Sequence, residues 1–235
     1  MSEITSPHNE QLKEVRKLAG RRWRDKLGEF VAEGEDLLEA ADAAGWVASA
    51  RYAATGSGLP GVPVAPHVLA TVSQLGSGTR ALAVYPQRWA PPVGPRCVAL
   101  WGVGDPGNVG TVIRSALAFG ASSVALGPGS ADPYSPKAVR ASMGALFSVP
   151  VGRVRSVAEL PGRRIALAAR AGEPLRAVDG DVTLVVGAER EGLPDDVLAA
   201  CDDVAHIPIV NADSLNAAMA ATVALYELTT RITRP

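Results

Sequence analysis

The sequence is poor in the residue types that mark several specialised classes of protein. Its 235 residues include two cysteines and three histidines, and aromatic residues make up 5% of the chain. Cys97 and Cys201 are too far apart to indicate a disulfide framework or a cysteine-rich metal cluster. The histidines share no spacing typical of metal ligands. We therefore expect two reduced thiols and no bound metal.

Long apolar runs are also missing. No stretch approaches the roughly 18–20 consecutive apolar residues that cross a bilayer. The first residues, MSEITSPHNEQ, lack the basic and then apolar order of a secretory signal. These two absences predict a protein without membrane association and with a cytoplasmic location.

Net charge is nearly absent, at -1, but the charges are unevenly distributed. Residues 95–235 carry thirteen basic and fourteen acidic side chains, whereas residues 11–27 carry seven basic and two acidic ones. Apolar residues recur in the basic segment at helical spacing, which turns Lys13, Arg16 and Lys17 toward solvent as a positive face. The basic segment is either an ordinary solvated surface or an RNA-binding surface that contacts phosphates, with Arg21, Arg22 and Arg24 as the candidate RNA contacts.

What the chain does contain is the composition and pattern of an α/β protein. It is 47% hydrophobic and 20% charged, enough to bury one or two cores. The stretch PQRWAPPVGPR, residues 86–96, has four prolines and little periodicity, so we place a linker there. The expected domains are a small N-terminal α/β domain, residues 1–92, and a second domain, residues 93–235. Strand-like and helical runs alternate in the second domain, which predicts a parallel sheet flanked by helices.

The segment ALWGVGDPGNVGTVIRSALAFG has the G-x-G-x-x-G spacing of a dinucleotide-binding turn. That site also needs an acidic residue about 20 positions further on, to bind a ribose. Here no acid follows until Asp132, and Pro106 removes a backbone N–H where the helix begins. The segment is therefore not a dinucleotide site, although a nicotinamide- or flavin-dependent oxidoreductase stays open as a rival class.

Polar residues instead gather where the predicted strands end. Asn108 and Arg114 bracket a helix start, Glu189 lies between glycines after a buried strand, and Ser214 and Asn216 follow another strand. Loops at the carboxyl ends of parallel strands commonly form ligand sites, so these residues predict one pocket. Asn108 and Ser214 have an alternative role as helix caps.

Three motifs in this order resemble those of the SpoU (TrmH-like) family of RNA ribose 2′-O-methyltransferases, in the SPOUT superfamily. They are DPGNVGTVIRSALAFGA, VVGAEREGLP and IPIVNADSLNAAMAA, and the similarity spans about residues 95–230. The intervening GSADPYSPKAVRASMGALFSVPV also resembles the family. Within it, Lys137 and Arg140 stand one helical turn apart, and we include both among the candidate RNA contacts. NEQLKEVRKLAGRRWRDKLGEFVAEG resembles the small ribosomal-protein-like RNA-binding domain that many members carry.

The resemblance implies S-adenosylmethionine as methyl donor, a C-terminal trefoil knot, and a homodimer whose site lies near the subunit interface. It favours ribosomal RNA over transfer RNA as substrate. It assigns catalysis to Arg114, with Asn108, Glu189, Ser214 and Asn216 around it. It assigns cofactor binding to Leu126, Gly127, Gly187, Gly192, Ile207, Ile209 and Leu215.

Two features qualify these implications. A guanidinium rarely gives up its proton, so we expect Arg114 to stabilise the developing 2′-alkoxide or bind a phosphate rather than act as a base. The third motif is slightly shorter than usual at residues 210–213, which predicts a left-handed backbone at Asn211. An RNA-binding module with an inactive transferase domain is therefore a second rival class, beside the oxidoreductase.

Overall fold

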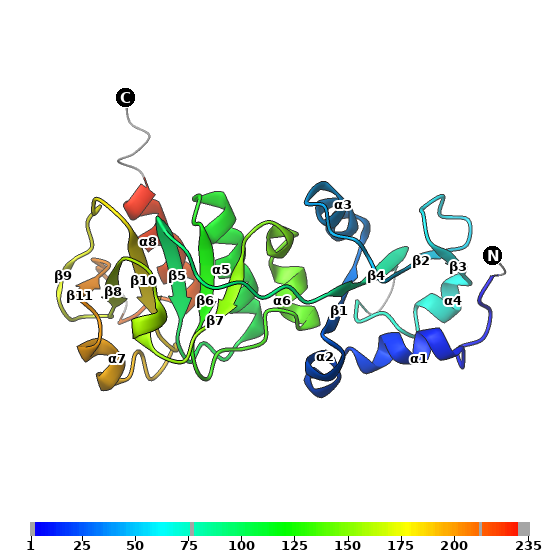
Figure 1. The fold of residues 1–235 in the computed structure, drawn as a ribbon, viewed down its shortest axis with the longest axis horizontal. Coiled ribbons are helices and arrows are strands. Elements are labelled where there is room, and N and C mark those ends of the chain that lie inside the picture. Colours follow the sequence, from blue (N-terminus) through cyan, green and yellow to red (C-terminus); the bar gives the residue numbers. More distant parts are fainter. Residues whose placement is uncertain (1–2, 76–77, 212, 230–235) are drawn as a thin grey trace, which may run out of the picture. The chain divides into compact units, whose positions relative to one another are not determined.

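A computed structural model describes residues 3–75, 78–211 and 213–229 (Figure 1). Its internal contacts divide the chain into two compact units. The N-terminal unit comprises Met1–Gln87 and Asp132–Phe147, and the C-terminal unit comprises Arg88–Ala131 and Ser148–Pro235. The boundary expected at residues 92 and 93 did not anticipate that residues 132–147 pack with the N-terminal unit.

The N-terminal unit is built on a four-stranded sheet with the order β1-β4-β2-β3. β4 pairs antiparallel with β1 and β2, and β3 pairs parallel with β2. The strands are β1 (Glu29–Glu33), β2 (Ala50–Ala54), β3 (Val62–Val64) and β4 (Ala81–Pro86). The helical elements are α1 (Glu10–Lys17), α2 (Arg21–Leu27), α3 (Glu35–Ala43), α4 (Pro66–Leu69), α6 (Pro136–Ala141) and the 3₁₀ turn η1 (Ala145–Phe147).

Two apolar clusters hold this unit together. α1 buries Leu12 and Val15 against β2, β3 and α4, so the helical periodicity predicted for its sequence is confirmed. The second cluster is aromatic, and Tyr134 and Phe147 of the returning segment both pack against Phe30 of β1. Residues 132–147 therefore supply part of the core of the N-terminal unit.

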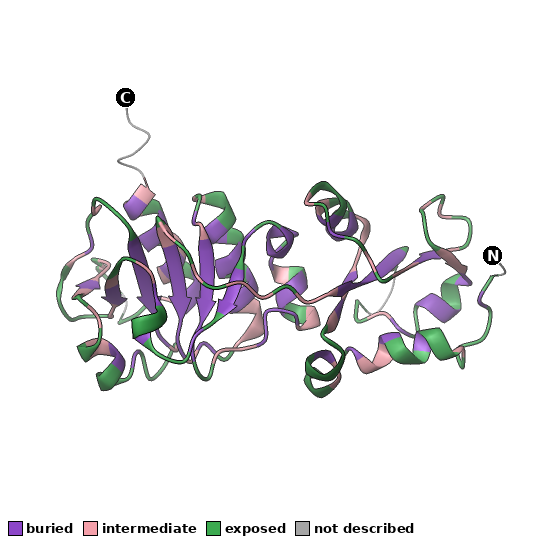
Figure 2. Ribbon diagram, in the orientation of Figure 1, coloured by how far each residue is buried: buried purple, intermediate pink, exposed green. Residues whose placement is uncertain are grey.

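The C-terminal unit has a sheet with the order β7-β6-β5-β10-β8-β11-β9 in which every pair of strands is parallel. The predicted parallel sheet is therefore confirmed. Its strands are β5 (Arg96–Leu100), β6 (Ser123–Leu126), β7 (Val151–Arg153), β8 (Arg163–Leu167), β9 (Glu173–Pro174), β10 (Val182–Val186) and β11 (Asp203–His206). Figure 2 shows the central strands coloured as buried, as expected for a sheet covered on both faces.

Helices cover both faces of this sheet. α5 (Pro106–Ala118) and α8 (Ala217–Thr229) pack against each other, and α8 also contacts β10. The opposite face packs against η2 (Val157–Glu159) and α7 (Asp195–Ala199), which join Ala99 and Val185 in one buried cluster. The strands are thereby held between two apolar layers.

The proline-rich stretch expected to be a linker is instead bound to the edge of this sheet. The Ala90 N–H donates to the Val151 carbonyl at 3.0 Å, and the guanidinium of Arg153 lies 3.9 Å from the centre of the Trp89 ring. A Cβ at Gly152 would lie 2.3 Å from the Ala90 carbonyl oxygen, so only glycine allows this approach. Because the ladder of β7 is covered in this way, the stretch from Arg88 onward is part of the C-terminal unit, whereas Pro86 ends β4 and Gln87 stays with the N-terminal unit.

Candidate active site

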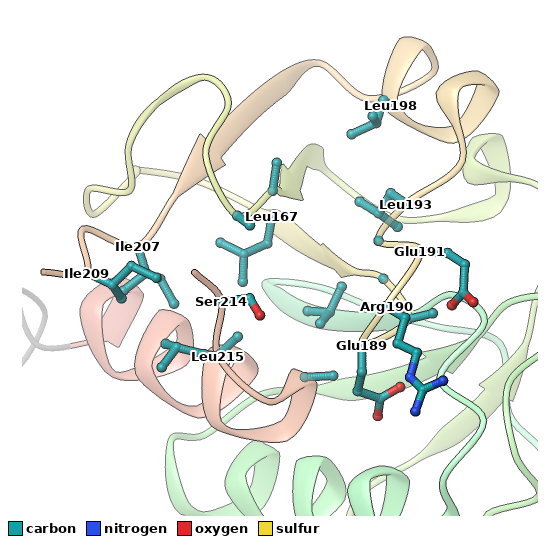
Figure 3. Close-up of a pocket in the computed structure, with 18 residues that line it drawn as sticks. Leu167, Glu189, Arg190, Glu191, Leu193, Leu198, Ile207, Ile209, Ser214 and Leu215 are labelled. Carbon is teal, nitrogen blue, oxygen red and sulfur yellow. The ribbon is translucent and has the colours of Figure 1, made fainter. Parts of the chain in front are cut away.

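A cavity of about 370 Å³ lies at the carboxyl ends of the parallel strands (Figure 3). This volume is typical of small-molecule sites, and this edge of a parallel sheet is where such sites form. The walls come from three loops that follow β8, β10 and β11. They consist of Leu167–Ala169, Val186–Leu193, Ile207, Ile209, Ser214 and Leu215, together with Leu198, Ala217 and Ala220 of the flanking helices.

Five of the seven residues expected to contact a cofactor line this cavity. They are Gly187, Gly192, Ile207, Ile209 and Leu215. Figure 3 shows the last three on one side of the cavity, with Glu189 and Arg190 on the other. The cavity therefore has an apolar wall facing a charged one, which suits a ligand with a flat apolar part and a charged part.

The other two expected cofactor residues, Leu126 and Gly127, lie outside the cavity lining. Leu126 is buried, and a Cβ at Gly127 would lie 2.3 Å from the ring of Trp101. Gly127 is thus required for the close packing of that ring against the backbone. The cofactor contact expected at these two positions stays a prediction.

The loop after β10 is a tight hairpin. Ala188 and Gly192 exchange two backbone hydrogen bonds, of 3.1 and 3.0 Å, and Gly192 has a φ angle of 70°. A Cβ at Gly187 would lie 2.4 Å from the carbonyl carbon of Gly192, so the hairpin folds directly onto this glycine. The two glycines allow a sharp reversal that places Glu189 at its tip, beside the cavity.

A chain of hydrogen bonds joins Glu189 to the first and third motifs. Asn216 Nδ2 donates to Asn108 Oδ1 at 3.2 Å, and Asn108 Nδ2 donates to Glu189 Oε1. Asn216 Oδ1 accepts from the backbone N–H groups of Ala218 and Met219, which fixes the orientation of its amide. Each side chain in this chain is therefore oriented by the next one, and the carboxylate is its final acceptor.

The helix caps differ from the alternatives considered for the sequence. Asp105 is the N-cap of α5, where its side chain accepts from the N–H of Asn108 at 3.0 Å. Asn216 caps α8, so neither Asn108 nor Ser214 serves as an N-cap. The Asn108 side chain is thereby available to bind Glu189, and Ser214 lines the cavity.

Arg114 lies on α5 outside the cavity lining, and its side chain is exposed. Six residues separate it from Asn108, which corresponds to about 9 Å along a helix and about 120° around it. The structure therefore brings Asn108, Glu189, Ser214 and Asn216 together and leaves Arg114 on a neighbouring face of the same helix.

The predicted RNA contacts divide into exposed and buried residues. Arg21 and Arg22 are exposed on α2, and Lys137 and Arg140 are exposed on α6. Arg24 is only 3% exposed, and its Nε donates to Asp132 Oδ2 at 2.8 Å. Its Nη1 donates to the last carbonyls of the α1 turn. The expectation that Arg24 contacts RNA is therefore wrong, because a carboxylate more than 100 positions away pairs with it inside the unit.

The shortened third motif also differs from expectation. Among the residues that the structure describes, Met143 is the only non-glycine residue with a positive φ angle, so Asn211 is not left-handed. Asp213 instead forms an ion pair with Arg170, which follows the cavity residues at the end of β8. The loop after β11 is thus joined to the loop after β8, the neighbouring strand.

Sequence reasoning missed the contribution of β8. Leu167, Ala168 and Ala169 line the cavity, although the sequence LAAR carries no motif. The rule that loops at the carboxyl ends of parallel strands form the site would have found them. Within the described ranges, no group of three or more His, Cys, Asp or Glu side chains is placed to hold a metal ion, and no helix is long and apolar enough to cross a membrane.

Two family models match the chain, and they do so along most of its length. The model of the SpoU rRNA methylase family matches residues 95–226, and that of an MRM3-like substrate binding domain matches residues 9–79. The first match covers more than half of the sequence. The chain therefore belongs to the SpoU family.

Individual relatives are similar over different shares of their length. The 23S rRNA (guanosine(2553)-2′-O)-methyltransferase RlmP of Bacillus subtilis is 29% identical over 97% of this chain and 99% of its own. The 23S rRNA (uridine(2479)-2′-O)-methyltransferase of Streptomyces viridochromogenes is 42% identical over 52% of this chain. This chain spans about half the length of the first two curated relatives that it matches, at 48% of each.

A solved structure with the same fold carries a ligand. The AdoMet-bound rRNA methyltransferase from Sinorhizobium meliloti superposes with a TM-score of 0.88, at 30% identity. The match covers 100% of this chain and 99% of that one. The two-unit architecture is therefore shared with a methyltransferase that binds S-adenosylmethionine.

Proposed function

We propose that this protein transfers a methyl group from S-adenosylmethionine to a ribose 2′-hydroxyl of ribosomal RNA. The observation that carries the proposal is the cavity at the sheet edge, built by the loops of the second and third motifs and bordered by the Asn216–Asn108–Glu189 chain. The names of similar proteins support 23S ribosomal RNA, rather than transfer RNA, as the substrate class. Ribosomal RNA as substrate also supports the cytoplasmic location.

The residues present suit this methyl donor. Ile207, Ile209 and Leu215 give an adenine ring an apolar wall, and Gly187 and Gly192 leave backbone groups accessible beside it. When bound, the donor would supply a methyl carbon on a sulfonium; the carbon–sulfur bond breaks to leave a neutral thioether, and the proton of the 2′-hydroxyl is released to water. The protein then has to hold a ribose hydroxyl against that carbon, and positioning alone supplies several kcal/mol of rate enhancement.

Fixed polar groups perform this positioning. Asn216 caps α8 and orients Asn108, which in turn holds the carboxylate of Glu189 at the rim of the cavity. Glu189 and Ser214 bind the ribose that reacts, since both line the cavity. Arg114 contributes a permanent positive charge that stabilises the developing alkoxide or binds the adjacent phosphate.

Arg114 reaches such a position when a second copy of the chain covers its helix. Leu117, one turn after Arg114, is 48% exposed, and Met219, Val223 and Tyr226 of α8 are between 43% and 60% exposed. The two helices are in contact, and the Tyr226 ring lies edge-on to Phe119 at 6.1 Å. An exposed apolar face of this kind marks an interface between proteins, so we propose a homodimer through α5 and α8.

The oligomeric state tests this part of the proposal. Tyr226→Glu should convert the dimer to a monomer in light scattering, because it places a charge at the centre of the apolar face. Its methyl transfer should fall at least tenfold while binding of S-adenosylmethionine by each chain is retained. A monomeric wild-type protein with full activity would contradict the homodimer.

The N-terminal unit is proposed to select the RNA. Arg21 and Arg22 are exposed on α2, and the ammonium groups of Lys17 and Lys26 lie 4.9 and 5.1 Å from the centre of the Trp23 ring. An aromatic ring beside two ammonium groups suits a surface that combines base stacking with phosphate contacts. Membership in the SpoU family supports the trefoil knot in the C-terminal unit.

One experiment separates the proposed enzyme from an inactive binding module. The purified protein is incubated with S-adenosylmethionine labelled in its methyl group and with unmodified 23S ribosomal RNA, and the RNA is hydrolysed with alkali. A 2′-O-methyl group protects its phosphodiester bond, so label should appear in alkali-resistant dinucleotides. Binding of the methyl donor in calorimetry without any label in the RNA would favour the inactive module. Absence of both donor binding and RNA labelling would refute the proposal.

A further inference from the structure

Met143 lies in a backbone conformation that side chains rarely adopt. Its φ angle is 48°, and no other non-glycine residue in the described part of the chain has a positive φ. The left-handed region brings Cβ close to the following carbonyl, so an unbranched L-residue is disfavoured there and glycine is the usual choice. The backbone at this position therefore calls for glycine, yet the sequence has methionine.

The surrounding turn explains the conformation but not the side chain. The Met143 N–H donates to the Arg140 carbonyl at 3.1 Å, and Ser142 Oγ donates to the Val139 carbonyl at 2.7 Å. A Cβ at Gly144 would lie 2.5 Å from Cβ of Ala40 in α3, so the turn packs closely against this helix of the same unit. The Met143 side chain itself is 56% exposed. Packing therefore does not account for a methionine here, and strained backbone at an exposed position is a frequent property of binding sites.

Met143 directly follows a pair of exposed cations on α6. Lys137 and Arg140 are three positions apart on one side of this helix and are exposed, whereas Ala138 and Val139 are buried. α6 ends at Ala141, and the turn beyond it keeps the exposed Met143 next to Arg140, whose carbonyl accepts from the Met143 N–H. The two cations and the thioether therefore belong to one short exposed strip.

The same strip belongs to the unit that carries the basic helix α2. Both α2 and α6 contact β1, and Figure 1 shows them beside that strand. The buried Arg24–Asp132 pair, at 2.8 Å, ties α2 to the segment that leads into α6. The two helices are therefore held in a fixed arrangement within the N-terminal unit.

We propose that Lys137, Arg140 and Met143 form an RNA-binding strip that extends the substrate-binding surface beyond residues 9–79. The two cations contact phosphates, and the Met143 side chain packs on an unstacked base or its ribose. The positive charge of the strip and its attachment to the α2 unit favour RNA over a protein partner. This inference rests on the proposed function, since it assumes that the protein binds ribosomal RNA.

The test measures binding of unmodified 23S ribosomal RNA to the full-length protein in a filter assay, over a range of salt concentrations. Lys137→Gln/Arg140→Gln should lower the slope of log K against log salt by up to about two units, because each phosphate contact contributes about 0.9. At 0.15 M salt this corresponds to about fivefold in affinity per contact. Arg80→Gln is the control. Arg80 is an exposed arginine of the same unit that directly precedes β4 and pairs with Glu35, so this variant should bind RNA like the wild type.

Met143 is tested by two substitutions with opposite expectations. Met143→Gly accepts the left-handed backbone without strain and removes the side chain, so it should fold normally and bind RNA up to about fivefold more weakly, with an unchanged salt slope. Met143→Leu keeps an apolar side chain of similar size and should bind within twofold of wild type. A glycine variant with lower thermal stability than wild type would show that the side chain serves packing, and would overturn its role in binding.

The outcomes also distinguish this inference from the proposed function. If the wild-type protein methylates 23S ribosomal RNA while the variants of Lys137, Arg140 and Met143 match Arg80→Gln in RNA affinity and salt slope, the strip is not an RNA contact. The proposed methyltransferase activity is then unaffected. If wild type neither binds nor methylates the RNA, both proposals fail. Binding of a protein from solution at the strip, with RNA affinity unaffected by the variants, would also overturn the inference.

Discussion

Gly187 offers a direct test of how the candidate site is built. A Cβ there would lie 2.4 Å from the carbonyl carbon of Gly192 and 2.5 Å from the nitrogen of Leu193, whereas ordinary contact begins at 3.4 Å. Gly187→Ala therefore has to push the hairpin away by about 1 Å. Overpacking of this kind costs about 1–3 kcal/mol of folding free energy. Since the hairpin carries Glu189, its bond to Asn108 should be lost, and a 1 Å misplacement lowers turnover by about 100-fold.

Two other glycines of the same unit serve as controls. At Gly192 a Cβ meets no atom within 4 Å but the φ angle is 70°, so Gly192→Ala should cost about 1–2 kcal/mol from backbone strain alone. At Gly104 the nearest atom is 4.0 Å away and φ is not positive, so Gly104→Ala should be neutral or slightly stabilising. Urea unfolding, calorimetry with S-adenosylmethionine and turnover on 23S ribosomal RNA are measured for all three. A Gly187→Ala protein as stable and active as Gly104→Ala would refute the packing argument.

Three further predictions concern charged residues. Arg114→Ala should abolish methyl transfer and leave affinity for S-adenosylmethionine within a few fold, while Arg114→Lys should recover activity only if a point charge suffices; wild-type turnover of the alanine variant would exclude this residue from the mechanism. Asp132→Ala leaves Arg24 buried without its partner and should lower stability to urea by about 3–5 kcal/mol, whereas the double variant Asp132→Leu/Arg24→Met should lose less; equal losses would contradict the burial argument. The hydrogen bond from Arg164 lowers the pKa of Asp202 from 3.8 to about 2, so this carboxylate stabilises the fold above about pH 4 and the effect is lost as pH falls toward 2. Asp202→Asn should flatten the fall in denaturation midpoint across that pH range, and an unchanged pH profile would exclude the ion pair as its cause.

Local sequence patterns were sufficient to predict the features that depend on residues close together along the chain. The alternation of apolar runs and helical patterns predicted the parallel sheet, because strands buried on both faces need continuous apolar residues. The rule that loops meet at the carboxyl ends of parallel strands predicted that Glu189 and Ser214 share one pocket. The structure confirms both the sheet and the meeting of these loops at one cavity.

Tertiary contacts decided which arginines are buried and which glycines pack against another side chain. Arg22 and Arg24 flank Trp23 in the sequence, but the partner of Arg24, Asp132, is 108 positions away, and only the folded unit shows that Arg24 is buried. The close packing of the Trp101 ring against Gly127 likewise appears only in the folded unit.

Tertiary contacts also place residues 132–147 in the N-terminal unit. Tyr134 and Phe147 pack on Phe30, and the local sequence does not predict this because an aromatic residue is equally suited to the core of either unit. The sequence by itself therefore determined the family, the sheet and the order of the site motifs, which depend on short-range patterns. Only the tertiary structure decided which charges and glycines face a ligand, because burial and pairing are set by residues that approach from distant parts of the chain.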